Sequence, residues 1–317
     1  MGFVLAAIVI AAVLLIAIVL MAYVKVKGSL EMRKTSSPDA PKKVTVLEFD
    51  VGYPHHEAAA EWMDGVNKET VHLTSFDGLK LTAAYIAHPN PRGGALVFPG
   101  WTDRKEYYYA EIKMLYDMGF SILCPDQRAM GESEGRYCTF GARERKDALG
   151  WLEILEKLTP QPHIVLGRSM GAAVSMLLSC DAGERIAACI EDCGYTSMEE
   201  EMRHFVRQTG QNIPPAFESV FFFLARPMIR LFGGDLRRAD CLKELPDCKV
   251  PMLFIHGTAD DFVPYYMMDK LYQAHGGKKR KLSVDGAEHA RAFAEGTGEY
   301  IQTVNGFLND ILGGYEP

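Results

Sequence analysis

Short apolar runs rich in β-branched residues alternate with amphipathic stretches along most of this chain of 317 residues. The runs typical of strands are 80–87, 95–98, 120–124, 163–166, 186–190, 250–255 and 280–284, and the helical stretches are 106–118, 141–158, 170–180, 265–274 and 290–312. Strands that alternate with helices form a mostly parallel sheet with helices on both faces. We therefore predict an α/β fold of this kind.

One interval breaks the alternation. Residues 192–245 lie between two predicted strands and are too many for a simple crossover, so we expect a helical lid insert at about 195–245. Its many phenylalanines could pack the insert onto the sheet, line an apolar acyl pocket, or touch a bilayer.

The N-terminal segment predicts a membrane anchor. Residues 1–24 carry no charged side chain and no proline, and about 20 apolar residues in a helix cross a hydrocarbon core of roughly 30 Å. A cleaved signal peptide would begin with a positive region and have a shorter apolar core. We predict a transmembrane anchor at 1–24, a basic flexible linker at 25–43 and a body at 44–317.

The charge distribution predicts which side of the membrane the body occupies. The net charge is −7, but residues 25–43 hold six cations and two acids, which leaves −11 for residues 44–317. Cations that follow the apolar segment place the body in the cytoplasm by the positive-inside rule. The seven cysteines include no CxxC pair, which fits a reducing compartment. The acidic body argues against a nucleic-acid partner.

The main chemical motif is Gly167-Arg168-Ser169-Met170-Gly171, between a strand-like and a helix-like run. A sharp strand-to-helix turn exposes the serine hydroxyl at a helix N-terminus, and the glycines leave room for the turn. In this setting we expect Ser169 to be a nucleophile rather than a simple helix cap.

A serine nucleophile needs a base and an acid, and both follow in the chain. Asp260 and Asp261 come after the apolar run 250–255, and His289 comes after the run 280–284. The carboxyl ends of parallel strands meet at one edge of a sheet, where these side chains could converge with Ser169.

These segments resemble the α/β-hydrolase superfamily, in particular bacterial serine-aminopeptidase-like and acetylesterase-like hydrolases, over roughly residues 70–313. FPGWTD resembles the family's oxyanion loop, PDQRAMGESEG a structural loop, GRSMG the nucleophile elbow, and HGTADDFVP and GAEHA the acid and base loops. The resemblance implies the α/β-hydrolase fold.

The resemblance also implies roles for individual residues. Ser169 is the expected nucleophile, His289 the base and Asp260 the acid, because the family places the acid three residues before the Val-Pro pair; Asp261 is the rival. Backbone N–H groups of Trp101 and Met170 are the expected oxyanion donors. In the PDQRAMGESEG loop, we expect Asp126 and Arg128 to brace the structure rather than contact substrate.

The expected function is hydrolysis of a carboxylic ester or related acyl bond through an acyl-enzyme. We expect a small-molecule acyl ester as substrate and the membrane as a partner. Because the sequence contains no Walker A, dinucleotide, HExxH or spaced Cys/His motif, we expect no cofactor and no metal. A serine peptidase or acyltransferase, and a non-catalytic hydrolase-like binding domain at the membrane, remain alternatives.

Overall fold

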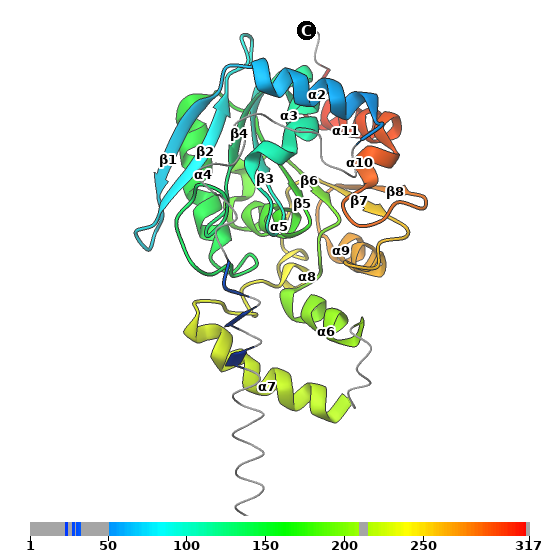
Figure 1. Ribbon diagram of the computed structural model, residues 1–317. Coiled ribbons are helices and arrows are strands. Elements are labelled where there is room, and N and C mark those ends of the chain that lie inside the picture. The colour runs from blue at the N-terminus through cyan, green and yellow to red at the C-terminus, as the bar shows by residue number, and fades with distance from the viewer. Residues whose placement is uncertain (1–22, 25–26, 29, 33–50, 209–214, 315–317) are drawn as a thin grey trace, which may run out of the picture.

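A computed structural model describes residues 23–24, 27–28, 30–32, 51–208 and 215–314 (Figure 1). The anchor predicted at 1–24 lies outside the described residues except for Tyr23 and Val24. Within the described residues, no helix is both long and apolar enough to cross a bilayer.

The described body is built on one eight-stranded sheet with the order β1-β2-β4-β3-β5-β6-β7-β8. Strands β1 and β2 pair antiparallel, as do β2 and β4, and all other neighbours pair parallel. The strands are β1 (Glu69–Thr74), β2 (Lys80–Ile86), β3 (Gly93–Phe98), β4 (Phe120–Pro125), β5 (His163–Arg168), β6 (Ala188–Asp192), β7 (Met252–Gly257) and β8 (Lys279–Val284). The predicted, mostly parallel sheet is confirmed.

Helices cover both faces of the sheet (Figure 1). One apolar core joins the sheet to α4 (Glu144–Leu158), α5 (Met170–Ala182) and α9 (Tyr266–Ala274). A second core joins the other face to α2 (Pro54–Gly65), α3 (Tyr109–Asp117), α10 (Ala292–Glu295) and α11 (Thr297–Leu312). Strands β3 to β7 are buried along their whole length because both of their faces are covered.

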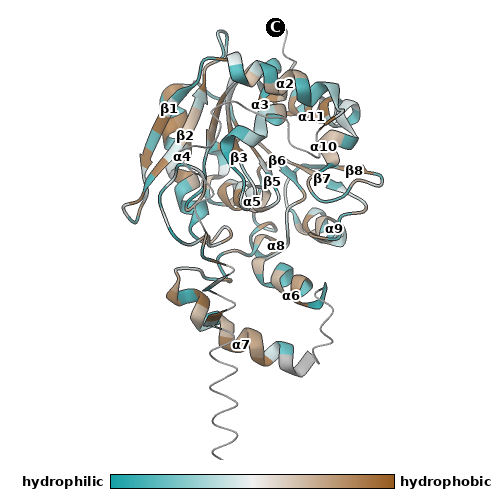
Figure 2. Cartoon of the chain, in the orientation of Figure 1, coloured by the Kyte–Doolittle hydropathy of each residue, from teal (hydrophilic) through white to brown (hydrophobic). Residues whose placement is uncertain are grey.

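The interval between β6 and β7 holds α6 (Met198–Gln208), α7 (Pro215–Leu231) and α8 (Cys241–Glu244). Figure 1 shows α6 and α7 beyond the end of the sheet, and Figure 2 shows that much of α7 is hydrophobic. Its role as a lid stays a prediction.

Part of the expected linker packs against the body. Leu30 is only 2% exposed, Glu31 forms an isolated antiparallel bridge with Tyr137, and the Arg136 guanidinium lies 2.7 Å from the Glu31 carboxylate. The expected flexible stretch at 25–43 therefore includes a short docked segment at residues 30–32.

Helix α5 packs closely against the end of β3. A Cβ atom on Gly171, the second residue of α5, would lie 1.9 Å from the Phe98 carbonyl oxygen. Backbone atoms cannot give way as a flexible side chain can, so only glycine allows this approach.

We expect Gly171→Ala to lower the free energy of unfolding by roughly 1–3 kcal/mol, because α5 must shift away from β3. Gly298→Ala is the matched control: Gly298 is the second residue of α11, and a Cβ there would meet no atom within 4 Å. Urea unfolding compares the two variants. Equal stability of the two would contradict the close packing described here.

Candidate active site

Ser169 occupies a strained turn between β5 and α5. Its φ of +57° and ψ of −118° are rare for a residue with a side chain. A Cβ on Gly167 would lie 2.1 Å from the Gly171 carbonyl oxygen, so the turn also requires glycine there. The Ser169 N–H donates to the Asp192 carbonyl at 2.8 Å, which ties the turn to β6.

The side chains of Ser169, His289 and Asp260 form a continuous hydrogen-bonded chain. Ser169 Oγ lies 3.0 Å from His289 Nε2, and His289 Nδ1 lies 2.8 Å from Asp260 Oδ2. The His289 side chain is 23% exposed and that of Asp260 is fully buried. Solvent thus reaches the imidazole but not the carboxylate. The structure brings these three sequence-predicted residues together.

The Asp260 carboxylate accepts hydrogen bonds from several donors. Its Oδ1 accepts from the backbone N–H groups of Phe262 at 3.0 Å and Val263 at 2.9 Å. Its Oδ2 lies 3.2 Å from His256 Nε2. Burial favours the neutral acid, but hydrogen bonds from His256 and His289 outweigh it and lower the pKa of Asp260. The carboxylate therefore stays ionised beside His289.

Asp261, the rival acid, is in a different setting. Its side chain is exposed, and its backbone carbonyl lies 2.9 Å from His204 Nε2 of α6 and also accepts from the Gln208 amide.

A close backbone approach joins the acid and base loops. A Cβ on Gly257, the last residue of β7, would lie 2.1 Å from the Ala287 carbonyl oxygen. The Ala259 N–H donates to the same carbonyl at 3.0 Å. This approach holds Asp260 and His289 within hydrogen-bonding distance.

The loop that follows β3 carries Trp101 and is anchored by Tyr108. The Gly100 N–H donates to Tyr108 Oη at 2.7 Å, and that hydroxyl donates to Asp103 Oδ2 at 2.9 Å. The Gly100 N–H thus already has a partner inside the protein. Met170 is the first residue of α5, where the backbone N–H has no partner within the helix.

Arg168, inside the elbow, links the elbow to the same loop. Its Nε lies 3.2 Å from Tyr108 Oη, its guanidinium lies 4.3 Å from the centre of the Tyr108 ring, and its Nη1 donates to Glu111 at 2.8 Å. The Arg168 side chain is buried, and its contacts with Tyr108 and Glu111 connect the elbow to the loop that follows β3 and to α3.

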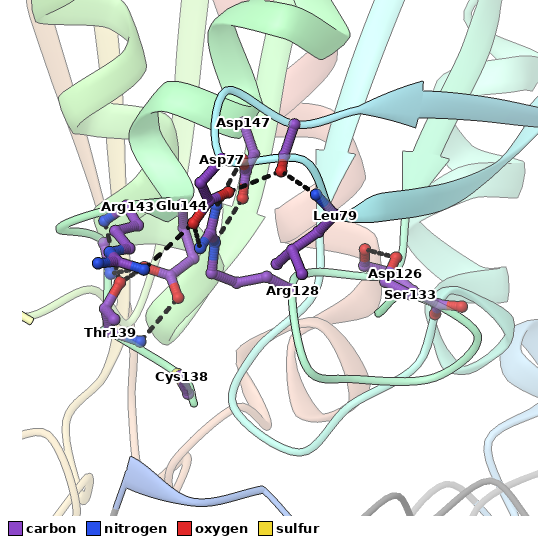
Figure 3. Close-up of polar contacts among 12 residues, drawn as sticks. Asp77, Leu79, Asp126, Arg128, Ser133, Cys138, Thr139, Arg143, Glu144 and Asp147 are labelled. Atoms are coloured by element: carbon purple, nitrogen blue, oxygen red, sulfur yellow. Dashed lines mark hydrogen bonds and ion pairs between the residues drawn. The ribbon is translucent and has the colours of Figure 1, made fainter. Parts of the chain in front are cut away.

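The PDQRAMGESEG loop is also braced by buried charges (Figure 3). Arg128, 2% exposed, donates two hydrogen bonds to Asp147 of α4, at 2.7 and 2.8 Å, and two to Asp77 of the β1–β2 turn, both at 3.1 Å. Asp126 lies 2.6 Å from Lys105 Nζ. Both residues are committed to protein partners, as expected for bracing residues.

One group of the described residues has the composition of a metal site. Ligand atoms of Cys193, Asp260 and His289 lie within 4.8 Å of one another. Asp260 and His289 already bond to each other, and burial raises the pKa of the Cys193 thiol. A metal ion at this place would have to break the hydrogen bond between His289 and Asp260 and deprotonate a buried thiol, so these residues fit a metal poorly.

The profile of the alpha/beta hydrolase fold family matches residues 96–294. This chain belongs to that family. YqkD of Bacillus subtilis is 24% identical over 290 residues, covering 89% of this chain and 90% of that protein. The lysophosphatidylserine lipase ABHD12 of Danio rerio is 26% identical over 230 residues, covering 71% of this chain and 55% of the lipase. The Pyrococcus furiosus esterase Pf2001 superposes with a TM-score of 0.67 at 20% identity, covering 90% of this chain and 99% of the esterase.

The sequence did not reveal the supporting residues Tyr108, Arg168 and His256. Tyr108 lies in a run of three tyrosines, and nothing in that run distinguishes the one that contacts Gly100. His256 stands four residues before Asp260 in the HGTADD segment. This spacing is the sequence feature that could have indicated the contact between the two side chains.

Buried Glu191 makes stability depend on pH. It lies on β6, with its Oε2 accepting from Gly194 N–H at 2.9 Å. Burial raises its pKa to about 8, although nearby His256 opposes the shift. The native state keeps this proton until about pH 8, whereas an unfolded glutamate loses it near pH 4.5. The contribution of Glu191 to stability is therefore complete below that lower pH and lost as pH rises toward 8.

We expect Glu191→Gln, which stays neutral, to be more stable than the parent protein at pH 8 and to lose part of that advantage at pH 5, a change on the order of a few kcal/mol. Chemical unfolding at both pH values measures it. Glu153→Gln, at an exposed position, should keep the parental pH dependence. An advantage for Glu191→Gln that did not grow with pH would contradict this account.

Proposed function

We propose that this protein is a serine hydrolase that cleaves a carboxylic ester through an acyl-enzyme intermediate. The observation that carries the proposal is the hydrogen-bonded chain Ser169–His289–Asp260, with distances of 3.0 and 2.8 Å. The family match and the esterase and lipase among similar proteins support the hydrolase class.

In the first step, Ser169 Oγ attacks the ester carbonyl carbon while His289 Nε2 accepts the hydroxyl proton. The ionised Asp260 holds the imidazole in place and stabilises its positive charge. The N–H groups of Trp101 and Met170 donate to the carbonyl oxygen as it becomes an oxyanion.

In the next step the tetrahedral intermediate collapses. The bond to the leaving alkoxide breaks, and His289 gives that oxygen the proton it took from Ser169. Water then attacks the acyl-enzyme with His289 again accepting a proton, and release of the carboxylic acid restores Ser169. Esters suit this site better than amides because an alkoxide leaves with less acid assistance than an amine.

The proposed enzyme is held at a membrane. Residues 1–24 would form the anchor, with the membrane as partner and a small-molecule acyl ester as substrate. The cations of residues 25–43 follow the apolar segment, which supports a single-pass arrangement with a cytoplasmic catalytic body.

We expect Asp260→Asn to lower kcat for p-nitrophenyl acetate by roughly 10³–10⁴-fold, because the amide favours the wrong imidazole tautomer and carries no charge. The matched control, Asp261→Asn, should change kcat little, since that side chain is exposed. Steady-state kinetics compares the two variants, and thermal unfolding checks that both are folded. A larger loss for Asp261→Asn would contradict the proposed acid.

A further inference from the structure

Helix α7 of the insert has an exposed apolar stripe. Val220, Phe223 and Leu231 are 53%, 72% and 78% exposed, and Pro227 is exposed between them. These positions are three or four residues apart, so they share one side of the helix. On the other side, Phe222, Ala225 and Ile229 are 0–2% exposed. A helix that is apolar on both sides has a second apolar environment to fill.

The N-terminal apolar segment ends beside this helix. The ring of Tyr23 lies 5.7 Å from that of Phe232, the residue that follows α7. Residues 1–24 are free of charge, and Tyr23 and Val24 close that segment. An anchor that leaves the bilayer at Tyr23 would bring α7 to the membrane surface.

We propose that the α7 stripe (Val220, Phe223, Pro227 and Leu231) docks on the lipid bilayer. This inference rests on the proposed membrane anchor. A helix that lies at a membrane interface buries the apolar face it presents about 5–10 Å deep, at the boundary between headgroups and acyl chains; on α7 the exposed stripe would be that face, because the opposite side packs on the protein.

Apolar contact, rather than charge, drives this docking. The cations on α7 already have acidic partners: Arg226 lies 2.8 Å from Glu199, and Arg230 lies 3.8 Å from Asp235. Neutralised arginines add little attraction to anionic headgroups. We therefore expect α7 to dock on vesicles of zwitterionic phosphatidylcholine, without anionic lipid.

An aromatic path leads from the insert to the candidate active site. On α6, the exposed Phe205 lies 6.5 Å, ring to ring, from Phe262, and Phe262 lies 4.8 Å from the His289 ring. Trp101 is also exposed, next to Phe140. An acyl chain that leaves the bilayer would meet apolar surface close to His289. The substrate class that fits is a long-chain acyl ester of a membrane amphiphile.

Bromolipid quenching tests the docking with the full chain in phosphatidylcholine vesicles. Phe223→Trp adds a fluorophore on the stripe, and Leu158→Trp adds one at an exposed apolar position on α4 of the body. With brominated phosphatidylcholine, the fluorescence added at position 223 should be largely lost and that at position 158 retained.

Two outcomes overturn the inference and can be told apart. If the protein floats with the vesicles but position 223 is quenched no more than position 158, α7 does not dock; dimerisation under these conditions would identify a second copy as the occupant. If the protein does not float with the vesicles, the proposed anchor fails as well.

The substrate class has its own test. Phe223→Asp combined with Leu231→Asp should lower hydrolysis of a palmitoyl lysophospholipid in vesicles by roughly tenfold or more, through lost apolar burial, and leave p-nitrophenyl acetate turnover unchanged. Leu158→Asp should change neither rate. If the double variant kept as much lysophospholipid turnover as Leu158→Asp, the inference would be overturned. A parent protein inactive on both esters would instead overturn the proposed function.

Discussion

The hydrogen bond between Ser169 and His289 joins residues 120 positions apart, and two backbone contacts that require glycine make it possible. Gly171 lets α5 approach the end of β3, and Gly257 lets the acid loop approach Ala287. The first contact sets α5 and the elbow against β3, and the second sets the acid loop against the base loop, so the sheet and its loops together set the geometry of the site. The strained backbone of Ser169 persists because the close contacts of Gly167 and Gly171 and the hydrogen bond to Asp192 hold it in place.

Buried charges hold the remaining loops of the site. Arg128 fastens its loop to α4 and to the β1–β2 turn, Lys105 bonds to Asp126, and Arg168 joins the elbow to Tyr108. An isolated charge would be costly at these depths, and each of these side chains has acidic or hydroxyl partners. Removing one partner would leave a buried charge uncompensated, so these pairs specify one loop arrangement.

The sequence predicted the strands of the parallel sheet because buried strands are short apolar runs. It missed β1, which alternates between exposed and half-buried residues, and α2, whose sequence PHHEAAAEWMDG is only weakly apolar. Ser169 and His289 could be chosen because each follows a predicted strand and stands in a recognisable motif, whereas Asp260 was preferred over its neighbour Asp261 only through the family's spacing to Val263-Pro264. Tyr108 could not be found this way, since its role depends on a contact between its hydroxyl and Gly100 that no local pattern encodes.

The proposed chemistry depends on Ser169 acting as a nucleophile that His289 activates. The most direct measurement is mass spectrometry of the full protein after reaction with a fluorophosphonate, with the modified peptide mapped. We expect one adduct, on Ser169, that forms far more slowly in His289→Ala. An adduct on another residue, or unchanged labelling of Ser169 in the folded His289→Ala variant, would contradict it.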